Sequence, residues 1–68
     1  MRNSERRIVN LLIRNIQHSL HELYMAAPTD FTAGQIYAYA ECLEILQLCP
    51  ALRKRFLRYP IEERFPLP

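Results

Sequence analysis

The stretch from Thr32 to Leu48 constrains the fold most, because its helical pattern carries apolar residues on more than one side. At 100° per residue, these side chains span an arc of about 220°, whereas an ordinary surface helix carries a stripe about 100° wide. A helix of this kind needs cover on two sides. The preceding helix supplies one cover, and either the C-terminal segment or a second molecule supplies the other. The arc contains Ile36, Ala38, Tyr39, Ala40, Cys42, Leu43, Ile45, Leu46 and Cys49.

The start of this helix is predicted at Thr32. Thr32 and Gln35 have the spacing of a capping box, in which the threonine hydroxyl accepts a hydrogen bond from the amide of residue 35 and the glutamine side chain reaches back to the amide of residue 32. Phe31 and Ile36 then occupy the two positions of a hydrophobic staple. The sequence therefore predicts a helix over residues 32–49.

An earlier helix is predicted over residues 4–27, with Asn3 or Ser4 as its cap. Its apolar residues recur three and four positions apart, as one helical face requires. Pro28 lacks an amide and disfavours helix at the preceding residue, so it ends this helix. The link to Thr32 is short, which makes the two helices antiparallel neighbours. The stripe consists of Val9, Leu12, Ile13, Ile16, Leu20, Leu23, Tyr24 and Ala27.

The C-terminal third is predicted to contain one short helix over residues 50–59, because proline suits a first helical turn and Pro50 occupies that place. Pro60 breaks this helix, and residues 60–68 form the tail. In the tail, residues 61–64 are compatible with another single helical turn, and residues 65–68 are predicted to be extended, with apolar side chains that are either docked on the bundle or loose. The fold class is therefore all-α, in one small domain over residues 1–68. It is an antiparallel helical hairpin with a short third helix and an extended C-terminal tail.

Composition favours self-association of this hairpin. Half of the 68 residues are hydrophobic, and a chain of this length has difficulty burying that much apolar surface internally. Two copies are predicted to pack as a homodimeric four-helix assembly. The candidate partner surface consists of Cys42, Ile45, Leu46 and Cys49.

The expected location is the cytoplasm, with reduced thiols. Cys42 and Cys49 are seven residues apart, about 10 Å along a helix, which exceeds the reach of a disulfide. The apolar run from Ile8 to Ile13 is interrupted by Asn10, so it does not read as a secretory signal. No apolar span approaches the roughly 20 residues that a membrane crossing needs, so no membrane partner is expected.

Charge is segregated along the chain. Residues 1–14 hold four arginines against one glutamate, residues 15–52 hold four acids and no Lys or Arg, and residues 53–68 hold five cations against two acids. The hairpin brings the first and last groups to one end. This basic end suits either the phosphates of a nucleic acid or an acidic protein, although the net charge of +2 is modest. The candidate basic patch consists of Arg6, Arg7, Arg53, Lys54, Arg55 and Arg58, with Arg2 at the same end.

Catalytic and metal chemistry find little support in the residues. His18 and His21 would supply two imidazoles, fewer than the three or four protein ligands of zinc sites. The sequence contains neither a Gly-rich phosphate loop nor a nucleophile elbow. We therefore expect no enzyme activity, no metal and no cofactor.

Two stretches of the chain carry a resemblance. They are Phe31-Thr32-Ala33-Gly34 and the run from Tyr37 to Gln47, Tyr-Ala-Tyr-Ala-Glu-Cys-Leu-Glu-Ile-Leu-Gln. Residues 31–47 resemble small uncharacterised helical proteins of Gram-positive bacteriophages and mobile elements. The resemblance implies a phage or prophage context and carries no site residues. The expected function is that of a non-enzymatic adaptor or regulator acting through protein contacts, and the alternative is a small nucleic-acid-binding protein.

Overall fold

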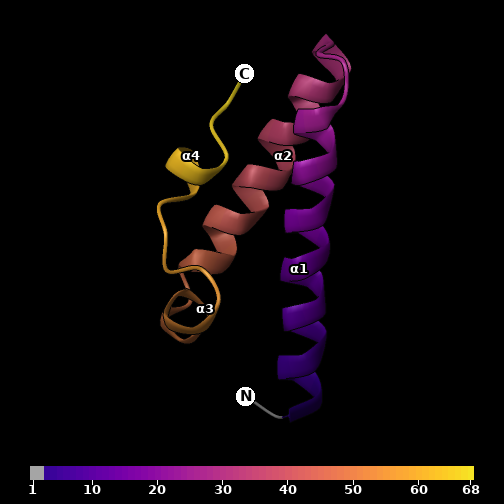
Figure 1. Ribbon diagram of the computed structural model, residues 1–68. Helices are drawn as coiled ribbons and strands as arrows, with labels where there is room; N and C mark the ends of the chain where they lie inside the picture. Colours follow the sequence, from indigo (N-terminus) through magenta and orange to yellow (C-terminus); the bar gives the residue numbers. More distant parts are fainter. Residues whose placement is uncertain (1–2) are drawn as a thin grey trace.

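The computed structural model describes residues 3–68, and these residues form helices and no strands. The helices are α1 (Asn3–Met25), α2 (Asp30–Gln47), α3 (Pro50–Arg55) and α4 (Ile61–Arg64), as Figure 1 shows. The all-α class and the hairpin of the first two helices are thus confirmed. The molecule is elongated, 39 × 20 × 14 Å. No helix in the described part of the chain is both long enough and apolar enough to span a bilayer.

The cap of α2 lies three residues before the predicted one, so the prediction of a cap at Thr32 was wrong. Thr29 is the cap: its hydroxyl accepts from the Thr32 amide at 3.1 Å, and the Thr32 hydroxyl accepts from the Thr29 amide at 2.9 Å. Starting at Asp30 places a carboxylate in the first turn, where the helix dipole favours it. Phe31 lies inside this turn with 75 % of its surface exposed, so it is not a staple residue.

The core begins at the contact between α1 and α2. Pro28 limits α1, which ends at Met25, two residues before the predicted end. The inward stripes of the two helices bury each other, as the spacing of three and four residues predicts. From α1 these residues are Ile13, Ile16 and Leu20, and from α2 they are Ile36, Ala40 and Leu43.

The C-terminal segment, residues 50–68, runs back along α2 and covers one side of the hairpin (Figure 1). Its buried side chains are Leu52, Leu57, Ile61 and Phe65. The prediction of one helix over residues 50–59 was too long, because α3 ends at Arg55, and the further turn that the sequence allows at residues 61–64 is present as α4. Gln47 explains the non-helical stretch between α3 and α4, because its side-chain amide donates to the carbonyls of Leu57 and Tyr59 at 3.0 and 2.8 Å. These carbonyls are satisfied without a continuous helix.

Two hydrogen bonds join the C-terminal segment to α1. The Gln17 side-chain amide donates to the Tyr59 hydroxyl, and the Tyr24 hydroxyl donates to the Pro66 carbonyl at 2.6 Å. The Tyr24 ring also stacks on Phe65 with 6.3 Å between centroids. Burial raises the pKa of the Tyr24 phenol above its ordinary value. Of the two alternatives for the tail, the structure therefore shows the docked one.

Candidate interaction surfaces

The side of α2 that the C-terminal segment leaves open is largely apolar. Ile45 precedes Gln47 by two residues, so it points about 160° away from the side chain that holds the C-terminal segment. Ala38, Cys42 and Ile45 follow one another at intervals of four and three residues along this open side. Ile45 is 60 % exposed and Cys42 is exposed. Leu46 and Cys49, the other two residues of the candidate partner surface, are partly buried and pack instead against the edge of the core.

Helix α1 extends this open side with residues that the sequence analysis did not assign to it. Ile8 is 65 % exposed and Leu12 is 47 % exposed. Nine residues separate Ile8 from Gln17, so Ile8 points about 180° away from the contact with Tyr59. Figure 1 shows α2 leaning away from α1 toward the N-terminal end of α1, the part of α1 that carries Ile8 and Leu12. We call Ile8, Leu12, Cys42 and Ile45 the uncovered face.

The predicted basic end is built around a cleft of about 570 Å³ between the N-terminal part of α1 and α3. Four of the six residues of the candidate basic patch line this cleft, and Arg7 and Arg53 lie outside its lining. Arg2 lies outside the described residues. Among the described residues that line the cleft, none is acidic. The cationic residues are Arg6, Lys54, Arg55 and Arg58, and the apolar ones are Ala51, Leu52 and Phe56.

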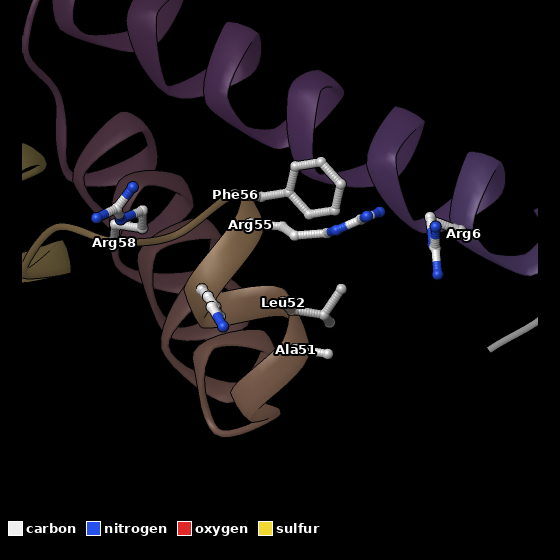
Figure 2. A pocket seen from close by; sticks show the side chains of 7 residues that line it. Arg6, Ala51, Leu52, Arg55, Phe56 and Arg58 are labelled. Atoms are coloured by element: carbon white, nitrogen blue, oxygen red, sulfur yellow. The ribbon is translucent and has the colours of Figure 1, made fainter.

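The cleft combines an apolar wall with cationic edges. Figure 2 shows Ala51, Leu52 and Phe56 directed from α3 toward α1, with Arg55 extended in the same direction and Arg6 across from it. Leu52 is buried and Phe56 partly buried, so this wall is continuous with the core. No Cα atom of α1 lies within 8 Å of one in α3 over the described residues, which leaves room for side chains of a ligand.

A further C-terminal cation is engaged elsewhere. The guanidinium of Arg64 lies 5.0 Å from the centroid of the Tyr59 ring, where a cation–π contact forms. Arg64 therefore makes a contact within the C-terminal segment and is not part of the lining of the cleft.

The histidines and cysteines are arranged as ordinary surface and packing residues. The His18 Nε2 atom lies 2.8 Å from the Glu22 Oε1 atom, one turn along the exposed side of α1. Cys42 and Cys49 are both free thiols. Within residues 3–68, no three His, Cys, Asp or Glu side chains are grouped so that they could hold a metal ion.

No protein-family model, curated protein or solved structure matches this chain. The uncovered face and the basic cleft are therefore the two features of this chain that bear on its function.

Proposed function

We propose that this chain is a small non-enzymatic adaptor or regulator that acts through protein contacts, and that two copies pair through the uncovered face. One observation carries the proposal: the C-terminal segment covers one side of the hairpin, while Ile45 and its apolar neighbours on the other side stay exposed. Exposed apolar surface gathered in one place is a common mark of a protein interface. The bacteriophage context that the sequence resemblance implies stays a prediction.

A second copy suits this face for two reasons. The intervals of four and three residues from Ala38 to Cys42 and Ile45 are those of the contact seam between paired helices. Small residues at two of these three positions let two backbones approach closely. The second reason is area. A standard interface buries about 800 Å² per partner, which is roughly 15 % of the 5281 Å² of accessible surface of this chain. Related by a twofold axis, two hairpins would form a four-helix assembly.

Sedimentation velocity at tens of micromolar tests the pairing. The wild-type protein is expected to sediment as a dimer, and Ile45→Lys is expected to sediment as a monomer of unchanged helicity, because Ile45 is exposed. Tyr37→Lys is the matched control. Tyr37 is similarly exposed on α2, lies on a different side and, like residue 45, is four residues from Glu41. A monomeric wild-type protein, or equal effects of the two substitutions, would contradict the proposal.

The competing function is nucleic-acid binding through the basic end, and the four cations around the cleft are the observation that favours it. Binding of duplex DNA would then weaken with salt at a slope of about −0.9 per phosphate contact. The patch offers at most four such contacts, so this binding would be weak and largely independent of sequence. A fluorescence titration over a range of salt concentrations measures the slope.

A further inference from the structure

We propose that the basic cleft between α1 and α3 binds an acidic peptide segment that places a large apolar side chain between its carboxylates. The cleft belongs to a different side of α1 from the uncovered face, because Arg6 and Ile8 are two residues apart and point about 160° from each other. The proposed site therefore goes beyond self-association: it would give an adaptor a second binding surface, available in the monomer and in the pair.

The cations of the cleft point to an anionic ligand. Lys54 and Arg55 stand in the last turn of α3, where cations also stabilise the helix dipole. Arg6 stands near the start of α1, where the dipole disfavours a cation, so helix stability does not account for it. Arg6 and Arg55 face the cleft from opposite edges (Figure 2). Guanidinium groups placed in this way bind carboxylates through paired, charge-assisted hydrogen bonds.

The wall of the cleft points to an apolar component of the same ligand. Ala51, Leu52 and Phe56 line it, and the volume of about 570 Å³ lies within the range of about 300–1,000 Å³ that is usual for ligand pockets. A carboxylate-rich segment without an apolar side chain would leave this wall facing water. A leucine or phenylalanine between the carboxylates would cover it and remove apolar surface from both partners.

A peptide fits this arrangement better than a nucleic acid does. Phe56 packs against the core, so its ring does not stand free as a platform for bases. The four cations surround a concave apolar wall, whereas binding to a nucleic-acid backbone relies on rows of cations that follow the phosphates.

Fluorescence anisotropy with three labelled probes tests the proposal. The first probe is a peptide of about twelve residues with glutamates on both sides of a Leu-Phe pair, the second replaces Leu and Phe by Ser, and the third is a single-stranded DNA of about twelve nucleotides. At about 50 mM salt, the first probe is expected to bind with the highest affinity, at least about fivefold more tightly than either of the others.

Matched variants locate the binding on the protein. Arg55→Glu and Arg53→Glu change the same charge in the same turn of α3, but only Arg55 lines the cleft. The first substitution is expected to weaken binding of the Leu-Phe peptide about tenfold or more, and the second by less than about threefold. Ala51→Glu places an acid in the cleft near the start of α3, where the helix dipole tolerates it. It is expected to weaken binding about tenfold.

Several results would overturn the proposal. These are no binding of the Leu-Phe peptide at about 100 µM protein, equal binding of the Ser peptide, equal effects of the substitutions at positions 53 and 55, and tighter binding of the DNA. Repeating the titration with Ile45→Lys separates this site from the proposed pairing. Unchanged peptide affinity in that variant supports a cleft that works in the monomer, and lost affinity contradicts it.

Discussion

Both sides of the hairpin carry apolar side chains, but the C-terminal segment covers these side chains on one side only. On one side, the C-terminal segment returns along α2 and buries Leu57 and Ile61 completely. On the other, Ile8 and Ile45 remain in water. The difference arises because residues 50–68 pack along one side of the hairpin only. The uncovered face is the apolar part of α1 and α2 that this segment leaves open.

The largest expected contrast is between Leu57→Ala and Ile45→Ala. Leu57 is fully buried, so its truncation should leave a cavity and cost about 2–5 kcal/mol of unfolding free energy. Ile45 is exposed, so in the monomer Ile45→Ala should cost less than about 0.5 kcal/mol. Urea denaturation at about 1 µM protein, where association is weak, measures both. Similar costs for the two would show that the C-terminal segment does not cover the hairpin as the structure shows.

Gln47→Ala tests what holds the C-terminal segment against the hairpin. Its side-chain amide donates to two backbone carbonyls of the C-terminal segment, and losing these hydrogen bonds should cost about 1–3 kcal/mol. Hydrogen exchange should show the loss as faster exchange in residues 56–65, with the amides of α1 less affected. Gln35→Ala serves as the control, because Gln35 is partly buried on the same helix. Equal effects of the two substitutions would mean that Gln47 does not hold the segment.

Thr29→Ala probes the turn between α1 and α2. Removing the cap should cost about 1 kcal/mol, and Thr32→Ala should remove part of the same stabilisation because the two threonines form one capping box. The double substitution should therefore cost less than the sum of the single ones. Strict additivity in a double-mutant cycle would contradict the reciprocal hydrogen bonds. The uncovered face is distant from this turn, so the sedimentation behaviour should not change.

Tyr24→Phe should cost about 0.5–1.5 kcal/mol of unfolding free energy, because it removes one hydrogen bond at the partly exposed end of the C-terminal segment. Burial raises the pKa of the folded-state phenol above its ordinary value of 10.0. The contribution of Tyr24 is therefore fully present below pH 10.0 and is lost as the pH rises through the raised pKa. Thermal unfolding curves from neutral to alkaline pH should show less alkaline destabilisation in Tyr24→Phe than in the wild-type protein.

Much of the fold could be predicted from local pattern. Spacings of three and four residues, together with Pro28, were sufficient for the antiparallel hairpin. The cap was misplaced because Thr29 and Thr32 each begin a plausible capping pattern, and only the folded turn decides between them. The docking of the tail depends on Gln17, Gln47 and partners distant in sequence. Local patterns do not contain that information.

The two surfaces differ in how far the sequence predicted them. Charge segregation along the chain brought Arg6 into the same predicted patch as the cations of α3, because a hairpin joins those ends. The apolar wall of the cleft was not predicted, since it depends on which side of α3 faces α1. Ile8 and Leu12 were also missed as part of the uncovered face, because their exposure depends on how α2 leans away from α1. The pairing of two copies stays a prediction.

The reactivity of Cys42 tests the central claim most directly, because this thiol lies on the uncovered face and is exposed in the single chain. In a Cys49→Ala variant it is the one remaining cysteine, so its rate of alkylation reports this face alone. If two copies pair here, the rate constant should fall as protein concentration rises from about 1 to 100 µM, in parallel with dimer formation in sedimentation. Adding Ile45→Lys should restore the fast rate at every concentration. A rate constant that does not change with concentration, whether the protein sediments as a monomer or as a dimer, would contradict pairing through the uncovered face.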